Sequence, residues 1–444
     1  MDSENTAVRT DVAIVGAGVS GLATAFRLKA AGVDCLVFER EQEVGGRTKV
    51  VKIDGSYAPA GAGVVYVGTE TDQMLGELGV ERRPIVPTYF GCHYDGLTIV
   101  AANDGQLIGG LPLSATAKSE LVDVLARIRA DYALYCVNGL SNASDSISKQ
   151  SFADYLGPMH PELQTFLARI AHPSCMIPGD QISAKYAIRY LVSKMARDAE
   201  HIAFIPRGFQ DLAFALHDRV SDEVRLETNV RRIESLGQGY RLDIETPHGP
   251  GEVHAKALVL AVPGPEVGKV MPSLPEWKTK AIAGVGSMTQ VVMSVVLDDV
   301  PQAIWSGIYN TAVVGRRFDW ISDCRAGTGL GAADGRTILQ IGIVGERAVA
   351  TLARGDEEIT REWLDDLEYV FPGSRRAVVG SHVQRWEHCF AMPRWDRHIY
   401  LPDAQRPAGG VFFAGDYASA SAGTHGCIDS AGRVAGEVSA YLRP

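Results

Sequence analysis

The stretch DVAIVGAGVSGLATAFRLKAAGVDCLVFER, residues 11–40, decides the fold. Its opening run, DVAIV, is short and almost entirely apolar, which is typical of a parallel strand buried on both faces. Gly16, Gly18 and Gly21 follow at once. At this spacing they allow a tight turn, a close approach of the backbone to a pyrophosphate, and close packing of the next helix. The stretch therefore predicts a strand, a glycine turn and a helix that ends at Gly32.

A second strand is predicted at 33–38 and leads directly to Glu39. Glu39 lies 23 residues after Gly16, close to the ~20-residue offset at which an acidic residue binds ribose hydroxyls. The order of strand, glycines, helix, strand and acid predicts an α/β, Rossmann-type dinucleotide-binding domain. Two simpler interpretations stay open: a glycine turn without a ligand, and Glu39 as a solvated strand end.

A second glycine pair follows in REQEVGGRTKV, where Gly45 and Gly46 precede Arg47. Such a segment supplies backbone amides and a guanidinium fork, both suited to phosphate. A nicotinamide-dependent dehydrogenase does not need this extra cradle. The segment therefore favours a flavin dinucleotide.

Several blocks of the chain resemble the flavin amine oxidase superfamily, which includes monoamine, polyamine and L-amino acid oxidases, protoporphyrinogen oxidase and phytoene desaturase. GAGVSGLATA, FEREQEVGGRTKV and PAGAGVV (59–65) are similar to its amino-terminal FAD fingerprint. The resemblance returns in FIPRGFQDLAFAL (204–216), VRLETNVRRIE (224–234), ALVLAVPGP (257–265) and VFFAGDYASASAGTHGCIDSAGRVAGEVSAYL (411–442).

The resemblance implies FAD as the cofactor. The implied binding residues are Gly16, Gly18, Ser20, Gly21, Glu39, Arg40, Gly46, Arg47, Gly61, Ala62, Gly63, Val64, Val230, Trp386, Gly415, Asp416 and Ile428. Within this set, the backbone of Val230 is expected to meet adenine and Asp416 to meet the ribityl chain. The helix that begins near Gly423 is expected to point its amino end at the flavin ring, where helix amides stabilise negative charge.

The same blocks predict how the chain is organised. We expect an FAD-binding domain from 1–70, 203–285 and 405–444, interleaved with an α+β substrate domain from 71–202 and 286–404. Helical periodicity within 115–200 and β-branched runs within 286–345 predict helical walls over a mixed sheet floor.

Two departures from the family argue against ordinary amine oxidation. Alignment places Gln290 where amine oxidases have a lysine that holds a water at flavin N5, and an amide cannot carry that charge. The segment 422–425, which matches the second ring of the family's aromatic amine cage, contains no aromatic residue. Trp386 and Trp395 are candidate walls for an aromatic substrate, with a core role for Trp386 equally open.

Gln290 and His425 are the candidate catalytic residues. His425 is the only histidine in a block matched to the flavin site, and it is a candidate proton acceptor. The alternative is a histidine hydrogen-bonded in the helix cap.

The predicted activity is FAD-dependent oxidation of a small organic molecule, an amine, amino acid or related specialised metabolite, by hydride transfer to flavin N5. Oxygen is the expected electron acceptor. The alternatives are a desaturase or aromatising dehydrogenase that oxidises a C–C bond, and redox-neutral or structural use of the flavin.

Composition limits the partners. With 43 Lys and Arg against 53 Asp and Glu, the net charge is −10, which argues against nucleic acid. Seven scattered cysteines without a CxxC pair indicate neither a disulfide framework nor a metal site, and they favour a cytoplasmic setting. No apolar run approaches the ~18 residues of a membrane span. A homodimer is left open.

Overall fold

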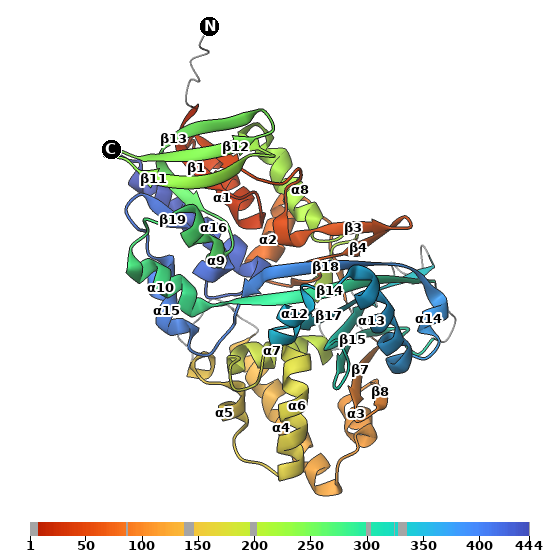
Figure 1. Cartoon of the computed structure of the whole chain (residues 1–444). Coiled ribbons are helices and arrows are strands. Elements are labelled where there is room, and N and C mark those ends of the chain that lie inside the picture. Colours follow the sequence, from red (N-terminus) through yellow and green to blue (C-terminus); the bar gives the residue numbers. More distant parts are fainter. Residues whose placement is uncertain are drawn as a thin grey trace.

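The computed structural model describes residues 8–85, 88–136, 146–195, 202–298, 303–323, 325–326 and 335–443. Two seven-stranded sheets organise the chain. The first lies with helices α1 and α16 at one end of the molecule, and helices α4 and α6 lie at the other (Figure 1). The long strands β14 and β18 cross between them.

The first sheet has the strand order β10-β2-β1-β13-β12-β11, with β19 beside β13. β1 is parallel to both β2 and β13, β19 is also parallel to β13, and β12 is antiparallel to β11 and β13. The strands are β1 (Val8–Val15), β2 (Cys35–Phe38), β10 (Val224–Arg225), β11 (Asn229–Ser235), β12 (Tyr240–Thr246), β13 (Gly249–Leu260) and β19 (Val411–Phe413).

Three helices bury their apolar faces against one another and this sheet: α1 (Val19–Ala30), α8 (Gln210–Arg219) and α16 (Gly423–Tyr441). Leu22 and Leu28 of α1 join Ile14, Leu212 and Val434 in one core, which explains the apolar periodicity of these segments. α1 begins at Val19, inside the glycine motif, so its first turn directly follows Gly18.

The second sheet has the strand order β18-β14-β17-β16-β15-β7-β8. It is antiparallel except between β15 and β7. The strands are β7 (Tyr89–Tyr94), β8 (Leu97–Ala101), β14 (Ser287–Asp298), β15 (Ile308–Val313), β16 (Trp320–Asp323), β17 (Arg336–Val344) and β18 (Val378–Ala391). β14 lies between two neighbours and is buried along most of its length, as its β-branched run predicts.

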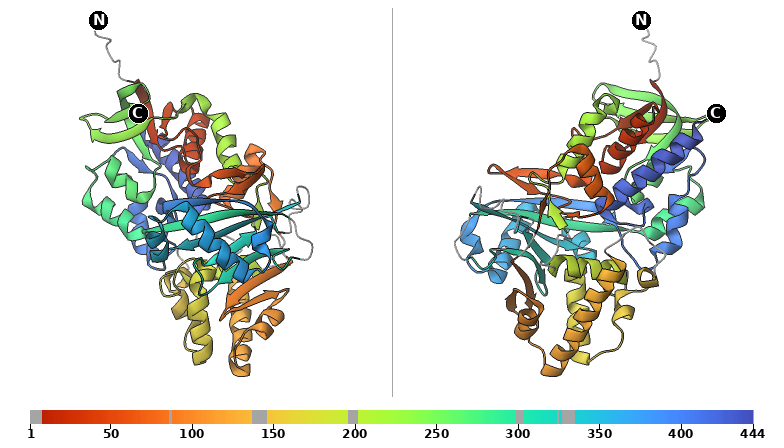
Figure 2. Two further views of the ribbon diagram at one scale, coloured as in Figure 1. Left: turned by 45° about the vertical axis from the view of Figure 1, so that its right-hand side comes forward. Right: turned by 180° about the vertical axis from the view of Figure 1, so that it is seen from behind.

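Helices cover both faces of the second sheet. Val291, Met293 and Val295 of β14 pack with α13 (Asp356–Val370). Met288 and Val344 instead join the core of α4 (Ala115–Tyr135), α6 (Pro161–Cys175) and α7 (Ala184–Met195). Figure 2 shows this second helical layer at the end of the molecule opposite α1.

Shorter elements complete the described structure. β3 (Val50–Ile53) and β4 (Ser56–Pro59) form a hairpin, and β5 (Val65–Tyr66), β9 (Ile202–Phe204) and β6 (Arg83–Pro84) form a small antiparallel sheet. The remaining helices are α2 (Glu70–Leu78), α3 (Asp104–Gly110), α5 (Phe152–Leu156), α9 (Gly264–Val270), α10 (Glu276–Val285), α12 (Glu346–Thr351), α14 (Ser374–Ala377) and α15 (Arg397–Gln405). The 3-10 helices are η1 (Gly46–Thr48), η2 (Ser146–Lys149), η3 (Ser221–Glu223) and η4 (Asp416–Ala418).

Within the described ranges, no helix combines the length and apolar character that a membrane crossing requires. The same ranges contain no group of three His, Cys, Asp or Glu side chains placed to hold a metal ion. The six described cysteines are free thiols, and Cys324 lies outside the described residues. The exact boundaries of the two predicted domains stay a prediction.

Candidate active site

The glycine turn after β1 has the backbone that a dinucleotide cradle requires. Gly16 has φ +103°, a left-handed conformation that favours glycine. A Cβ on Gly21 would lie 1.9 Å from the carbonyl oxygen of Gly16, so α1 packs on the turn without room for a side chain. Gly18 is different: its φ is −69°, and a Cβ there would meet no protein atom within 4 Å. Neither strain nor packing in the described part of the chain requires a glycine at 18, and its predicted role beside a pyrophosphate stays a prediction.

Glu39 is fixed against this turn. Its Oε2 accepts a hydrogen bond from the Ala17 amide at 2.7 Å, and its Oε1 accepts one from the Glu41 amide at 3.1 Å. Burial raises the pKa of the Glu39 carboxyl, and the two amides oppose this shift. Arg40 instead lies at the surface, 3.1 Å from the carboxylate of Glu41. The structure therefore places Glu39 against the cradle, whereas Arg40 pairs with Glu41 at the surface, and its contact with a cofactor stays a prediction.

The second glycine pair lies beside the first motif. The Gly45 amide donates to the Ala17 carbonyl at 3.0 Å, and Gly45 pairs with Gly18 in a short bridge. Gly45 and Gly46 have φ of +112° and +54°, which turn the chain into η1. The two glycine motifs thus form one continuous backbone surface.

Arg47 connects this surface to the second sheet. Its Nη1 donates to the Cys389 carbonyl on β18 at 2.6 Å, and its Nη2 lies 3.1 Å from Oδ1 of Asp416. Oδ2 of Asp416 accepts the amides of Ala391 (2.6 Å) and Gly423 (3.2 Å). Burial alone would raise the pKa of Asp416, but Arg47, the Ala391 amide and the charge of Arg397 hold it below its usual value. The ion pair joins the cradle, β18 and the amino end of α16 at one point.

The turn at 61–64 lies at the same junction. A Cβ on Gly61 would lie 1.9 Å from the Arg47 carbonyl oxygen, and the Ala62 amide donates to that carbonyl at 3.1 Å. The indole Nε1 of Trp386 donates to the Ala60 carbonyl at 2.7 Å. Gly63 and Val64 are half-buried and lead into β5. Trp386 is therefore tied to the turn, whereas Trp395 is 37% exposed.

The other predicted contacts lie on the elements around the cradle. Ser20 is buried in the first turn of α1, and Val230 is buried on β11 opposite Ile244. The Gly415 amide donates to Ser430 Oγ at 2.8 Å, and Ile428 is buried on α16. Their contacts with a cofactor stay predictions.

Gln290 lies on β14 between Val344 and Trp386, and it is 7% exposed. Its Oε1 accepts a hydrogen bond from the Cys389 thiol at 2.7 Å. Burial raises the pKa of this thiol to about 12, so the thiol is neutral near pH 7. Gln290 and Cys389 thus present a neutral, hydrogen-bonded pair on the sheet.

His425 lies in the first turn of α16 and is 6% exposed. Its Nδ1 lies 3.1 Å from Thr69 Oγ1, whose hydroxyl donates to the Tyr66 carbonyl at 2.6 Å. Thr69 Oγ1 therefore accepts from Nδ1–H, which leaves Nε2 with its lone pair. Burial first, and then the charge of Arg189, lower the pKa of His425 to about 3. This bond to Thr69 replaces the helix-cap bond considered as an alternative.

Sequence reasoning missed several residues of this region. Gln340 Nε2 donates to the carbonyls of Pro59 and Gly61 at 3.0 and 3.1 Å, so the sheet also holds the turn. The Tyr186 hydroxyl donates to Ala420 O at 2.9 Å and accepts the Ala422 amide at 2.8 Å, which fixes the approach to α16. Arg189 is a buried cation on α7. The sequence signal that could have identified Arg189 is its position between apolar residues of a predicted helix.

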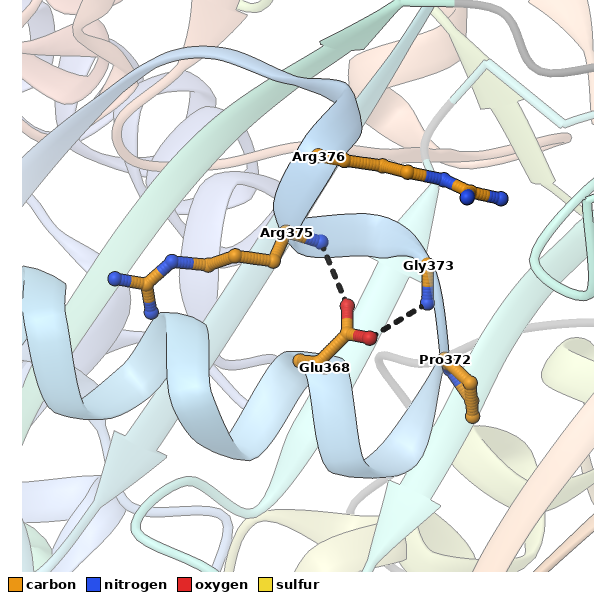
Figure 3. A pocket seen from close by; sticks show the side chains of 5 residues that line it. All are labelled: Glu368, Pro372, Gly373, Arg375 and Arg376. Atoms are coloured by element: carbon orange, nitrogen blue, oxygen red, sulfur yellow. Dashed lines mark hydrogen bonds between the residues drawn. The ribbon is translucent and has the colours of Figure 1, made fainter.

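A separate hollow lies beside α14 and is lined by Glu368, Pro372, Gly373, Arg375 and Arg376 (Figure 3). The Glu368 carboxylate accepts the amides of Gly373 and Arg375, each at 2.8 Å. The carboxylate and amides that line the hollow already bond to one another in the turn after α13, and the hollow lies on elements remote from α1 and the cradle (Figure 1). We assign it no part in the site.

Comparison with known proteins adds family evidence to this geometry. A protein-family model described as flavin containing amine oxidoreductase matches residues 19–439. AofH of Mycobacterium tuberculosis, assigned as a flavin-containing monoamine oxidase, is 26% identical over 275 residues, which cover 57% of each chain. The match thus spans a little over half of that relative's length. Protoporphyrinogen oxidase 2 of Arabidopsis thaliana is 39% identical over 116 residues, covering 25% of this chain and 23% of the relative.

A double variant of putrescine oxidase has a similar structure, with a TM-score of 0.76 and 20% identity over 98% of this chain and 100% of the other. This likeness confirms the predicted α/β fold class. The family match confirms the predicted resemblance, the flavin oxidoreductase class and FAD as the cofactor. The roles of individual residues stay predictions.

Proposed function

Because this chain belongs to the family of flavin-containing amine oxidoreductases, we propose that it oxidises a C–H bond of an amine, amino acid or related metabolite. FAD bound in the cradle would supply the two-electron acceptor at N5. The substrate would lose a hydride and a proton, and oxygen would take up two electrons and two protons as hydrogen peroxide.

The observation that carries this proposal is the position of Arg47. It contacts the Cys389 carbonyl on the substrate sheet and the Asp416 carboxylate before α16, directly after the second glycine motif. A dinucleotide with its pyrophosphate at Gly18 and its flavin half extending past Arg47 would therefore reach the surface formed by Gln290 and Trp386. The FAD-binding roles of the predicted residues belong to this proposal.

The proposed roles of the site residues follow from their charge and contacts. Gln290 would hydrogen-bond the substrate or a water without acting as a base, since an amide does not titrate near neutrality. Trp386, tied to the Ala60 carbonyl, would form a flat wall. His425 is neutral, and the lone pair on Nε2 could accept a proton from the substrate.

A desaturase or aromatising dehydrogenase is the second candidate. It is favoured by the bond between Cys389 and Gln290, because this pair offers no ammonium where amine oxidases of the family have a lysine. The relative described as protoporphyrinogen oxidase supports the same alternative. A cytoplasmic location, a homodimer and the two-domain division stay predictions alongside either activity.

Anaerobic mixing of the FAD-loaded protein with primary amines, amino acids and partly saturated ring compounds tests the proposal. We expect one class to bleach the flavin absorbance, and admission of air to restore it with formation of peroxide. An amine oxidase would release an imine or aldehyde with ammonia, whereas a desaturase would release a conjugated product. If no compound bleached the flavin faster than buffer, redox-neutral or structural use of the cofactor would replace this proposal.

A further inference from the structure

Arg189 on α7 is a buried cation with an unsatisfied hydrogen-bond donor. The residue is 6% exposed, and its Nη1 has no hydrogen-bond partner in the described part of the chain. Its guanidinium carbon lies 3.9 Å from the centre of the Tyr66 ring. Cation–π contact with one ring compensates only part of the cost of removing a guanidinium from water.

The buried cations Arg47 and Lys278 differ from Arg189 in this respect. Arg47 faces the Asp416 carboxylate, and Lys278 donates to the carbonyls at the end of α15. The ion pairs found among the described residues include none with Arg189. A buried charge is normally paired or strongly hydrogen-bonded. The missing partner of Arg189 is therefore expected from outside the described chain.

The described groups on which the charge of Arg189 acts are three tyrosines and a histidine. Its charge acts on Tyr132, Tyr186 and Tyr190, where burial raises each pKa and Arg189 opposes the shift. It also acts on His425, whose imidazole stacks edge-on against Tyr66 with ring centres 5.0 Å apart. None of these groups carries a negative charge near pH 7.

These neighbours place Arg189 on the substrate side of the proposed flavin site. Tyr186, one turn earlier on α7, holds the segment directly before α16 through Ala420 and Ala422. Tyr66 follows the 61–64 turn on β5. α7 itself packs with α4, α5 and α6, away from α1 and its phosphate cradle (Figure 1). The pyrophosphate would be held at Gly16–Gly21, so it is not the partner of Arg189.

We propose that Arg189 binds a carboxylate of the substrate, so that the enzyme acts on an acid-bearing small molecule such as an amino acid. This inference rests on the proposed function. The planar guanidinium fork matches a carboxylate in two parallel hydrogen bonds, and Nη1 is free to make one of them. A diamine would instead bring a second cation to a buried cation. The site therefore selects for acids over simple amines and diamines.

Calorimetric titration of the FAD-loaded protein tests the site without turnover. The probes are benzoate, phenylacetate and indole-3-acetate, each beside its neutral amide. We expect at least one acid to bind more tightly than its amide, and Arg189→Met to weaken that acid about 10- to 100-fold, the effect of lost charge-assisted hydrogen bonds. Arg189→Met should leave the amide unchanged, and Arg189→Lys should restore part of the acid affinity.

Arg169 is the matched control. It also lies over a tyrosine, 4.7 Å from the Tyr94 ring, but it is exposed and paired with Asp95 at 2.8 Å. Arg169→Met should leave acid binding unchanged. Because Arg189→Met removes an unpaired buried charge, we expect its melting temperature to equal or exceed that of the parent.

The outcomes separate this inference from the proposed function. Acids that bind no better than their amides, or that bind equally to Arg189→Met, overturn the carboxylate site even if amines bleach the flavin. A lower melting temperature of Arg189→Met with unchanged acid binding shows a structural role and also overturns it. If acids bind through Arg189 but no substrate reduces the flavin, the carboxylate site is supported and the oxidase proposal is refuted.

Discussion

Glu39→Ala should weaken FAD binding and also destabilise the cofactor-free protein. The carboxylate accepts the Ala17 amide at 2.7 Å and the Glu41 amide at 3.1 Å, so it fixes the cradle before FAD arrives. In the proposed complex it also accepts hydrogen bonds from the adenosine ribose. The substitution removes both functions.

The structure allows the two effects to be estimated. Hydrogen bonds to a charged acceptor contribute about 1.5–3 kcal/mol, so loss of the ribose contact should raise the Kd for FAD about 10- to 150-fold. Ala17 is fully buried, and its unpaired amide would cost about 1–3 kcal/mol of apoprotein stability. Glu41 is exposed, so water can satisfy its amide.

Quenching of FAD fluorescence by the apoprotein measures the Kd, and urea unfolding measures the stability. Glu39→Gln keeps one acceptor oxygen and should fall between the parent and Glu39→Ala in both measurements. Glu41→Ala is the control, because the Glu41 side chain is 65% exposed and its carboxylate pairs with Arg40 at the surface. An unchanged FAD affinity in Glu39→Ala would show that Glu39 only fixes the turn, and the ribose contact would be refuted.

Three further predictions concern other residues. Lys278 is fully buried and donates to the carbonyls of Asp403 and Ala404 at 2.5 and 3.1 Å. In urea titrations, Lys278→Met should therefore lower the free energy of unfolding by about 3 kcal/mol or more. Lys280 is exposed, so the control Lys280→Met should change the free energy of unfolding by less than about 0.5 kcal/mol. Folding lowers the pKa of His425 from 6.5 to about 3, so between pH 6.5 and about 3 the histidine is protonated in the unfolded chain but neutral in the folded one. The free energy of unfolding should therefore fall as the pH falls through this window. His425→Leu should show a shallower loss in pH-dependent denaturation, and an equally steep loss would exclude this histidine as the source. Gln290→Ala should slow flavin reduction about 10-fold, the effect of one neutral hydrogen bond, and Gln290→Lys should weaken substrate binding; equal stopped-flow rates in both variants and the parent would remove Gln290 from the site.

The structure of residues 11–40 could be predicted from the sequence because the contacts there are local in the sequence. The glycine spacing, the apolar strand and the acid at its fixed offset specify one strand–turn–helix–strand unit. The elements begin within a few residues of their predicted limits: the helix begins at Val19 rather than after the motif, and the second strand begins at Cys35 rather than 33. These shifts are usual where helix and strand ends fray.

The rest of the site could not be predicted because its contacts join distant segments. Arg47 was identified as a phosphate fork, yet its observed partners lie 342 and 369 residues away. Arg189 belongs to no motif, and only the folded structure shows that it is buried and that its Nη1 has no hydrogen-bond partner among the described residues. Periodicity specifies which face of a helix is buried but not which charges meet there.

The charges of the described site impose a final constraint on the substrate. Arg47 and Asp416 neutralise each other, the Cys389 thiol is protonated, and His425 is neutral. The buried Arg397 donates to the Asp416 and Ser419 carbonyls, so Arg189 is the positive charge that acts on His425. A bound carboxylate would remove that charge, and with it one of the two causes that lower the pKa of His425. The imidazole would then accept a proton more readily when the acid is bound than when the site is empty. An amino acid that arrives with a protonated ammonium group must lose a proton before hydride transfer. Its carboxylate would raise the pKa of His425 and so help the imidazole to accept that proton, whereas a simple amine has no carboxylate to do so.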